Sequence, residues 1–457
     1  MVPPARTPIA RVRPEHAAAA AFRRRRVEAR AAPMPPNGSG DERVLISGGG
    51  IGGLAAAVAL KQKGHRVLVV ERRQDAEAQK VGAAIALWGN AWRALDALGV
   101  ADGLREKYPP LERIQLCAPD RVLREFDLNE ECDGGPHEFR GVRRGDLLQA
   151  LQSKLDPETE ICYGVQVTKA EVRDEKKGHA GVEACMQRDG TSDVSTARFL
   201  ACVAADGINS PVARGCLTLR SPSYSGYAAF RGVGALDPST SASDRTVRQV
   251  LGRGVRAGTY PLGDGQVYWF VCFNAKEDEG GPEPGGPSSQ ALALARVPDW
   301  GHGVRDAIAA TPSDAISFSR IRDRWDLPSD TFGVGRVTAC GDAMHPMTPN
   351  LGQGGCCALE DAVVLGSAFR GNEGLATCEK SLRAYERERL KRTLPLTVRA
   401  NLMGQALQIS NPLVCAVRDA VIERVFSPAH FLDHTLYDPR EGGAFVDNFM
   451  KIGREGA

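Results

Sequence analysis

Long apolar segments are missing from this chain of 457 residues. No run approaches the roughly 18 residues that a helix needs to cross a bilayer, so a transmembrane helix is excluded. Hydrophobic residues make up 42% and charged residues 25%, which is the balance of an ordinary globular protein. The length is about three times that of a typical domain of ~150 residues, so we expect one long domain or two intertwined domains.

The chain also lacks the cysteine patterns that hold metals or exchange electrons. Its 12 cysteines are scattered, with no CxxC pair and no grouping with histidine at zinc spacing. Cys356 and Cys357 are adjacent, which suits a shared disulfide poorly. We therefore expect small, buried, reduced side chains in a reducing compartment, and predict no metal site and no redox-active disulfide.

The excess of positive charge is confined to the first 40 residues. Residues 1–40 hold eight arginines and two glutamates, a balance of +6, so the rest of the chain carries −4 of the total net charge of +2. A net negative charge on residues 41–457 argues against binding of nucleic acid, which is itself negatively charged.

Residues 1–40 are rich in Arg and Ala, poor in acids, and end in a Pro/Gly/Asn/Ser stretch. They lack the continuous apolar segment of a secretory signal. This composition resembles an organellar transit peptide, although no serine precedes Ser39. We expect a disordered leader that directs the chain to a chloroplast. A simple disordered tail on a cytoplasmic protein is the alternative.

Strand and helix patterns alternate from residue 41 onward. A strand at 43–47, a helix at 51–63 and a strand at 66–71 form a βαβ-type unit, and buried strands are expected at 199–204 and 336–340. Alternating strands dominate 224–273 instead. These patterns predict an α/β fold, with a Rossmann-like nucleotide-binding domain, an inserted, mainly antiparallel β domain for substrate, and a helical C-terminal region.

The predicted boundaries are a leader at 1–40, a discontinuous nucleotide domain at 41–110, 139–222 and 330–370, a β-rich domain at 111–138 and 223–329, and a helical region at 371–457.

The strongest local motif is Gly48-Gly49-Gly50-Ile51-Gly52-Gly53, between the first strand and the first helix. It reads as G-x-G-x-x-G, in which the first glycine permits a tight turn, the second lets backbone approach a pyrophosphate and the third lets helix and strand pack closely. Glu71 ends the second strand, 18 residues after the motif, where a carboxylate accepts hydrogen bonds from a ribose. The motif predicts a dinucleotide, FAD or NAD rather than NADP, although two arginines beginning at Arg72 follow directly.

Three further segments narrow the choice of dinucleotide. Residues 203–210 (VAADGINS) end a strand in an Asp-Gly turn, residues 341–349 (GDAMHPMTP) follow the last buried strand, and residues 350–355 (NLGQGG) open a helix. Singly, each reads as an ordinary turn. Together with the βαβ-type unit they resemble the class A FAD-dependent aromatic monooxygenases, over about residues 43–400.

The likeness is greatest to the plant and algal monooxygenases related to salicylate hydroxylase, on residues 89–100 (GNAWRALDALGV) and 345–349 (HPMTP). Zeaxanthin epoxidase is similar in the same motifs. It normally carries a further C-terminal domain, for which we expect this chain to be too short.

The resemblance implies roles for particular residues around FAD. Glycines 48, 50 and 53 match the positions that bind the ADP part, together with Glu71 and Arg72. Arg144 matches an arginine that faces the cofactor; read alone, it is an exposed arginine at a helix start. Asp206 matches the Asp-Gly motif near the cofactor and the path of the pyridine nucleotide.

The segment from Gly341 is implied to hold the flavin half. Asp342 matches the aspartate that binds the ribityl chain, although by itself it could be read as a general base. The loop beside the isoalloxazine ring is matched by Pro349, Gly352, Gly354 and Gly355. A helix that starts there would direct its positive end at the flavin.

Five other positions each have two possible roles. His345 belongs to the motif and is expected to serve local structure rather than proton transfer. Arg231 lies on a strand of the β-rich domain and, with Pro349, is a candidate for positioning substrate; a plain surface arginine is the alternative. Tyr260, Tyr268 and neighbouring Trp269 either line the pocket or belong to the core.

The resemblance implies a monooxygenase that uses NAD(P)H and O2 to hydroxylate an aromatic or similarly electron-rich small molecule through a flavin hydroperoxide. Only one G-x-G-x-x-G follows a strand, so NAD(P)H is expected as a transient co-substrate. The alternatives are a terpenoid or carotenoid olefin epoxidase of the same flavin class, and a low-turnover FAD-binding regulatory protein. The residues leave open the substrate, the choice between NADH and NADPH, and the oligomeric state.

Overall fold

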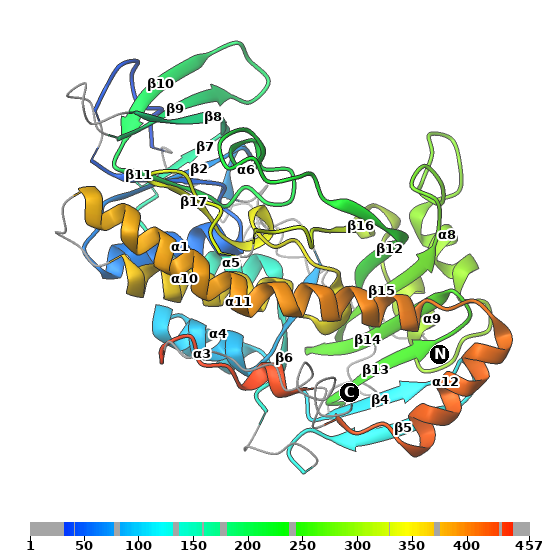
Figure 1. Cartoon of the computed structure of the whole chain (residues 1–457). Helices are drawn as coiled ribbons and strands as arrows, with labels where there is room; N and C mark the ends of the chain where they lie inside the picture. Colours follow the sequence, from blue (N-terminus) through cyan, green and yellow to red (C-terminus); the bar gives the residue numbers. More distant parts are fainter. Residues whose placement is uncertain are drawn as a thin grey trace, which may run out of the picture.

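The computed structural model describes residues 32–40, 42–76, 83–130, 137–157, 160–173, 181–236, 244–328, 330–369, 375–428 and 432–441. Residues 1–31, most of the expected leader, lie outside the described residues. Figure 1 shows two sheet regions joined by long helices, with the parallel sheet at the upper left and the larger sheet at the lower right.

A parallel sheet of five strands forms the nucleotide-binding part. Its order is β17-β11-β1-β2-β7, with bounds β1 Val44–Ser47, β2 Val67–Glu71, β7 Ile161–Tyr163, β11 Ala201–Ala204 and β17 Val337–Ala339. Every residue of β1 and β2 is buried, because both faces of this sheet are covered.

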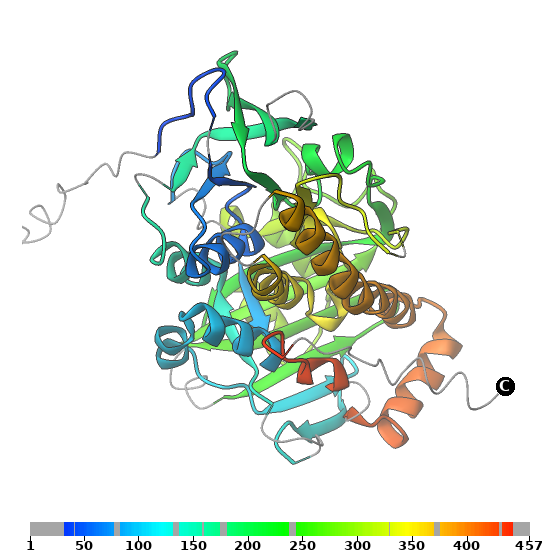
Figure 2. The ribbon, with the colours of Figure 1, turned by 60° about the vertical axis from the view of Figure 1, so that its left-hand side comes forward.

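Helices cover one face of the parallel sheet and a small sheet covers the other. The first face packs on α1 (Ile51–Gln62) and α10 (Gly354–Ala368), while the second meets the antiparallel strands β8 (Val165–Arg173), β9 (Gly181–Arg188) and β10 (Val194–Phe199). Figure 2 shows α10 between α1 and α11, and α10 also packs against α3.

The shorter elements of this part are β3 (Ala84–Leu87), β6 (Arg140–Arg143), α3 (Gly89–Leu98), α4 (Ala101–Lys107), α5 (Arg144–Gln152) and α6 (Pro211–Gly215).

A seven-stranded sheet forms the β-rich part, in the order β16-β12-β15-β14-β13-β4-β5. Its strands are antiparallel to their neighbours except for the β13–β4 pair. The bounds are β4 Arg113–Cys117, β5 Val122–Asp127, β12 Ser223–Ala235, β13 Thr246–Leu251, β14 Val255–Gly263, β15 Gln266–Asn274 and β16 Ser317–Asp323. One face packs on α8 (Ser289–Arg296) and α9 (Val304–Ala309), around Phe230 and Trp269.

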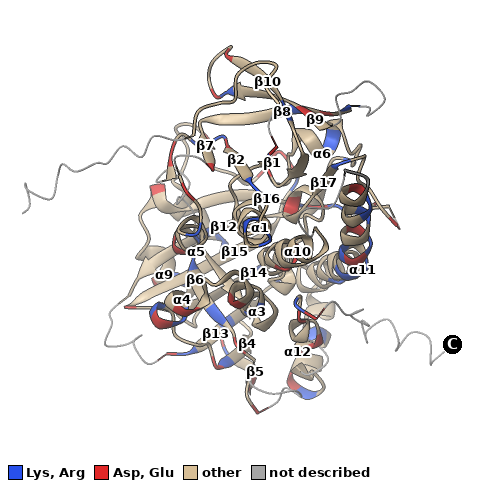
Figure 3. Cartoon of the chain, turned by 90° about the vertical axis from the view of Figure 1, so that its left-hand side faces the viewer, with Lys and Arg blue, Asp and Glu red and all other residues tan. Residues whose placement is uncertain are grey.

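The C-terminal region is helical. The 33-residue α11 (Leu375–Leu407) contains Pro395 and runs from the parallel sheet to the large sheet in Figure 1. Figure 3 shows charges of both signs along it. α12 (Pro412–Arg424) and a short turn of helix, η5 (Asp433–Leu436), follow. Among the described helices, none is both long and apolar enough to cross a membrane.

These elements confirm the predicted fold class, an α/β fold with a Rossmann-like parallel sheet, a mainly antiparallel β part and a helical C-terminal region. The predicted leader boundary is wrong at its end. Residues 32–40 pack on the nucleotide-binding part: the Ala32 N–H donates to the Ile161 carbonyl at 2.8 Å, and the Gly38 N–H donates to the Thr196 carbonyl at 2.8 Å. The Pro/Gly/Asn/Ser composition of this stretch favoured a disordered leader, yet it allows an extended segment to cover β10.

Candidate functional site

Three strands of the parallel sheet end at one edge, and the residues after them meet there. The register pairs Ser47 with Ala204 on β11, and Ala204 with Ala339 on β17. Asp206 and Asp342 therefore emerge side by side at the carboxyl ends of the strands, where open α/β sheets bind their ligands. The Ser47 hydroxyl donates to Asp206 Oδ2 at 2.8 Å and ties two of these strand ends together.

A cavity of about 630 Å³ opens at this edge. It brings together nearly all of the residues proposed from the sequence. Those that line it are Gly48, Gly50, Glu71, Arg72, Arg144, Asp206, Arg231, Gly341, Asp342, Pro349, Gly354 and Gly355. Gly53 and Gly352 are absent from the lining and contribute to packing nearby.

The glycine loop fits the roles expected of its members. Gly48 has φ +103°, and a Cβ there would lie 2.6 Å from the Ala205 carbonyl oxygen. A Cβ on Gly53 would lie 1.9 Å from the Gly48 carbonyl oxygen, so α1 and the loop pack too closely for any side chain. A Cβ on Gly50 would meet nothing within 4 Å. The space beside Gly50 is therefore open to a ligand.

Glu71 is buried, and both of its carboxylate oxygens accept backbone hydrogen bonds. Oε2 accepts from the Gly49 N–H at 2.8 Å and Oε1 from the Arg73 N–H at 2.8 Å. The carboxylate therefore also holds the glycine loop in place. Oε1 also accepts from Arg73 Nη1 at 3.4 Å. Oε2 keeps a second lone pair, and the residue lines the cavity, which fits acceptance of a ribose hydroxyl.

Burial raises the pKa of Asp206, against hydrogen bonds from Ser210 and Ser47 that lower it. Its Oδ1 atom is buried and accepts no hydrogen bond from the described residues. Burying an acceptor without a partner costs free energy, so this atom suits a donor brought by a ligand.

Asp342 and Arg144 face the same cavity with opposite charges. The surrounding protein raises the pKa of Asp342 by removing water, while His345 and Arg144 oppose that rise. Burial likewise lowers the pKa of Arg144, helped by Arg73 and opposed by Glu71 and Asp342. Both groups are short of water, so each gains from polar partners on a bound ligand.

The N-terminus of α10 points into the cavity. Gly354 and Gly355 begin this helix and line the cavity, and its first turn holds no acidic residue to neutralise the N–H groups. A Cβ on Gly355 would lie 2.3 Å from Ile85 Cδ1, so glycine lets the helix end approach β3. The positive end of the helix is therefore available to negative charge.

His345 is fully buried and is not among the cavity-lining residues. Its Nε2 lies 2.6 Å from Asp361 Oδ2 on α10, and Arg389 Nε donates to Asp361 Oδ1 at 2.6 Å. Burial opposes ionisation of Asp361, but His345 and Arg389 lower its pKa to about 2. This geometry agrees with the expected structural role of His345.

The large sheet supplies the opposite wall of the cavity. Arg231 on β12 and Tyr268 on β15 line it, and Arg231 Nη1 donates to the Ser319 hydroxyl at 2.6 Å. Burial raises the pKa of Tyr268 to about 12, against the charge of Arg231. Tyr260 stacks on Tyr268 with ring centroids 4.5 Å apart and is not among the lining residues, while Trp269 faces the core.

Sequence reasoning missed a buried arginine beside this wall. Arg256 is 2% exposed, and its Nη2 donates to Asn350 Oδ1 at 2.6 Å. Within the described part of the chain, neither Arg256 nor Arg231 forms an ion pair with a carboxylate. Charges removed from water are normally paired, so the unpaired Arg231 on the cavity wall indicates a place for negative charge. Arg256 lies on the same sheet face but is not among the residues that line the cavity. The available signal was a lone arginine two residues before Gly258 in an otherwise apolar strand.

Comparisons with known proteins agree with this geometry. Residues 41–400 match the FAD binding domain family. Monooxygenase 2 of Arabidopsis thaliana is 30% identical over 417 residues, covering 86% of this chain and 96% of the relative. Aurachin C monooxygenase/isomerase of Stigmatella aurantiaca is 32% identical over 387 residues, covering 84% and 94%. The solved structure of Klebsiella pneumoniae HpxO complexed with FAD and uric acid has a TM-score of 0.71 and 25% identity, covering 88% and 98%.

The chain therefore belongs to the class A FAD-dependent monooxygenases, a family of oxidoreductases. FAD is the cofactor. The cavity fits it: glycine backbone at Gly48 and Gly50, the orphaned acceptor of Asp206, and a helix N-terminus stand where a dinucleotide offers phosphates and hydroxyls.

Proposed function

We propose that this protein hydroxylates a negatively charged aromatic, or similarly electron-rich, small molecule with O2 and NAD(P)H as co-substrates. The observation that carries the proposal is the composition of one cavity. The residues that follow the parallel strands form one side of this cavity. Arg231 and Tyr268 of the large sheet form the opposite side. A substrate held by that wall lies next to the loop at Pro349.

The bound FAD supplies the redox chemistry, taking electrons from NAD(P)H and activating O2. The residues of the chain do the remaining work. The Gly48–Gly53 loop, Glu71, Arg144, Asp206 and Asp342 would hold the dinucleotide, and the N-terminus of α10 would stabilise negative charge next to Pro349. Arg231 would hold and orient an anionic group of the substrate, and the buried sheet wall would exclude water.

The unpaired cation Arg231 on the cavity wall supports a polar aromatic substrate over a hydrocarbon olefin. A terpenoid or carotenoid epoxidase needs an apolar wall, and a buried cation facing a hydrocarbon would lose solvation without gaining a partner.

A substrate screen tests the proposal. Purified FAD-loaded protein is incubated with NADH or NADPH and with phenolic acids, purines or carotenoids, while oxygen uptake is recorded. We expect an anionic aromatic to stimulate NAD(P)H oxidation and to yield a hydroxylated product. Stimulation by a carotenoid with an epoxide product would support the epoxidase instead, and no stimulation by any compound would support a low-turnover regulatory protein.

We also propose that the leader directs the chain to a chloroplast, on the support of its Arg- and Ala-rich, acid-poor composition. A fluorescent protein fused behind residues 1–31 should then enter plastids of plant or algal cells. Uniform fluorescence in the cytoplasm would overturn this proposal.

A further inference from the structure

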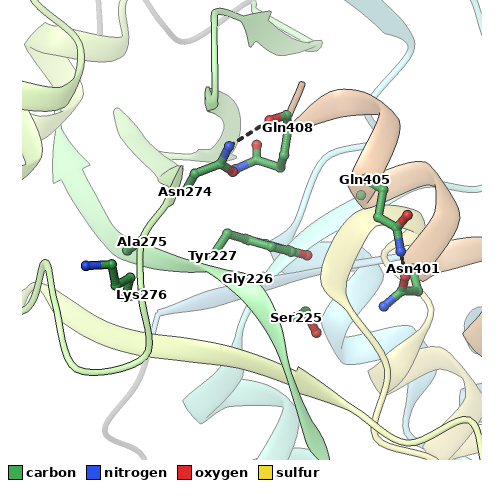
Figure 4. Close-up of a pocket in the computed structure, with 10 residues that line it drawn as sticks. Ser225, Gly226, Tyr227, Asn274, Ala275, Lys276, Asn401, Gln405 and Gln408 are labelled. Atoms are coloured by element: carbon green, nitrogen blue, oxygen red, sulfur yellow. Dashed lines mark hydrogen bonds between the residues drawn. The ribbon is translucent and has the colours of Figure 1, made fainter. Parts of the chain in front are cut away.

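A second cavity, of about 530 Å³, lies between the large sheet and the C-terminal half of α11. It shares no lining residue with the cofactor cavity. Figure 4 shows its walls, which come from the start of β12, the end of β15 and α11. The lining residues are Ser225, Gly226, Tyr227, Asn274, Ala275, Lys276, Asn401, Gly404, Gln405 and Gln408. Its size falls in the ordinary range for small-molecule sites, about 300–1,000 Å³.

Four side-chain amides dominate this lining, and they hold one another in place. Gln408 Nε2 donates to Asn274 Oδ1 at 3.2 Å, and Gln405 Nε2 donates to Asn401 Oδ1 at 2.7 Å. Asn401 Nδ2 in turn donates to Asp323 Oδ2 at 2.6 Å. The amides are therefore fixed in orientation before any ligand arrives.

Some donors and acceptors of these amides have no partner among the described residues. Each amide nitrogen carries two hydrogens, and Gln405 and Asn401 each use one of them within the described residues. Gln408 is 6% exposed, and its Oε1 accepts no hydrogen bond from any described residue. The pocket therefore offers both donors and an acceptor, and an unpaired buried acceptor costs free energy until a donor reaches it.

The lining is almost free of charge. Its one ionic side chain, Lys276, pairs with Glu279 at 2.9 Å, and Figure 4 shows it directed away from the amides. The nearby carboxylate of Asp323 is buried behind Ser225 and Asn401, both of which donate to it. An ion would gain little here. A neutral ligand with adjacent donor and acceptor atoms matches the walls.

We propose that this pocket is a second small-molecule site, distinct from the cofactor cavity, that binds a neutral molecule with an amide or urea edge. Such an edge places N–H and C=O side by side, which is the complement of a side-chain amide. The site does not depend on the proposed hydroxylation, because its walls contain none of the residues assigned to that reaction.

A hydrogen bond connects a wall residue of this pocket to the loop beside the cofactor cavity. Tyr227 is a wall residue, and its hydroxyl accepts from Asn350 Nδ2 at 3.1 Å. Asn350 directly follows Pro349, which lines the cofactor cavity. A ligand that contacts Tyr227 therefore acts on the flavin loop through Asn350.

Calorimetric titration of the FAD-loaded protein with uracil tests the binding site without any turnover. Uracil carries a urea edge and no charge. We expect saturable binding that Gln405→Leu weakens about tenfold, the scale of one lost hydrogen bond. Gln62→Leu removes an equally exposed glutamine at the end of α1 and should leave the affinity unchanged. 1,3-Dimethyluracil, which keeps the ring and loses both N–H donors, should also bind about tenfold more weakly.

Three results would overturn the proposed site. Uracil fails to bind, dimethyluracil binds as well as uracil, or Arg231→Ala abolishes uracil binding while Gln405→Leu does not. The last result would place uracil in the cavity proposed for substrate. Failure of the hydroxylation screen would leave all three readouts unaffected, so the two proposals fail separately.

The proposed link between this pocket and the loop at Pro349 and Asn350 is tested by the fluorescence of bound FAD. Uracil should change the fluorescence of bound FAD in the wild type. Tyr227→Phe should keep uracil affinity within about threefold and lose most of that change, because the variant lacks the hydroxyl that contacts Asn350. An equal change in both proteins, or none in the wild type, would overturn the link.

Discussion

Gly50 and Gly53 lie three residues apart in one loop, yet an added side chain would meet different surroundings at the two positions. Gly50 has φ −70°, a value open to any residue, and no atom lies within 4 Å of its would-be Cβ. Gly53 has no such space. We expect Gly50→Val to fold and to lose the yellow colour of FAD, since valine fills the space needed for close backbone approach to the pyrophosphate.

Absorbance near ~450 nm, where bound flavin absorbs, and thermal unfolding of the apoprotein together measure this. Gly53→Ala serves as the comparison, because its Cβ would clash with backbone and lower the stability of the apoprotein itself. A Gly50→Val protein that keeps stoichiometric FAD would show that the pyrophosphate does not pass this loop.

The raised pKa of Asp342 can be tested by measuring protein stability as a function of pH. Its pKa is raised by burial above the ordinary 3.8, so in the apoprotein the stability that depends on the neutral carboxyl is present below 3.8 and is lost as pH rises through the raised pKa. Asn cannot ionise. The melting temperature of apo Asp342→Asn should therefore exceed that of the wild type by a margin that grows as pH rises above 3.8 and through the raised pKa of Asp342. A constant margin would contradict the raised pKa.

The choice between cofactor anchor and general base for Asp342 is settled by Asp342→Ala. An anchor that accepts hydrogen bonds from FAD should weaken FAD retention by about 1.5–3 kcal/mol when it is removed. Excess FAD should then restore most of the rate of flavin reduction. A general base would instead keep FAD and lose ~10²–10⁴-fold in the hydroxylation step.

Arg231 should show the opposite pattern. We expect Arg231→Ala to keep full FAD content, because its side chain bonds Ser319 on the large sheet rather than the nucleotide loop. The KM for an anionic substrate should rise, and more hydrogen peroxide should form per product, since a loosely held substrate leaves the reacting centre open to water. Flavin content, KM and the peroxide-to-product ratio measure this. Normal coupling and KM would remove Arg231 from the substrate site.

At the scale of elements, α10 and α11 are joined by buried ion pairs. Arg389 of α11 is fully buried and donates from Nη2 to Glu360 and from Nε to Asp361, each at 2.6 Å. Removing Arg389 leaves Glu360 with Arg392 and Asp361 with His345 as their remaining side-chain partners of basic type. Because two buried carboxylates then each lose one cation, Arg389→Met should lower the free energy of unfolding by about 3–5 kcal/mol. Arg387→Met removes an exposed arginine two residues away in the same helix and should cost about 1 kcal/mol or less. Urea unfolding of both variants compares them.

The elements near the glycine motif could be predicted from the sequence, since their signals are local. Residues 43–71 show an apolar strand, a glycine turn and a helix in immediate succession, and the structure has each within a few residues of its predicted place. The strand ends at Asp206 and Asp342 could be predicted because each follows a buried apolar run.

Contacts between distant segments could not be predicted in the same way. Asn90 donates to both Gln353 and Glu360, more than 260 residues away, and nothing in its own neighbourhood marks it as part of that network. Arg256 is likewise buried because β14 pairs with β15 beneath the loop that holds Asn350. Such positions depend on strand order and register, which the pattern of one segment does not contain.

For the molecule as a whole, residues 32–40 belong to the described fold, although the composition of the leader placed them with residues 1–31. Ala32 is 4% exposed within a core cluster that also contains Leu68 and Cys162. The Arg198 N–H donates to the Ser39 carbonyl at 2.9 Å, so this segment runs along β10 and covers an edge of the small sheet that would otherwise stand open.

A protein that starts at Ala32 should therefore melt at the temperature of the full chain and bind FAD equally well, because none of the described contacts is lost. A protein that starts at Asp41 loses the three backbone hydrogen bonds made by Ala32, Gly38 and Ser39, along with the burial of Ala32. At about 0.5–1.5 kcal/mol for each hydrogen bond, it should be less stable by roughly 2–5 kcal/mol and should aggregate more readily through the bare edge of β10. Thermal unfolding and light scattering of the two truncated proteins, both loaded with FAD, measure the difference. Equal stability would mean that residues 32–40 lie on the surface without contributing to the fold, and the boundary at 41 would then be restored.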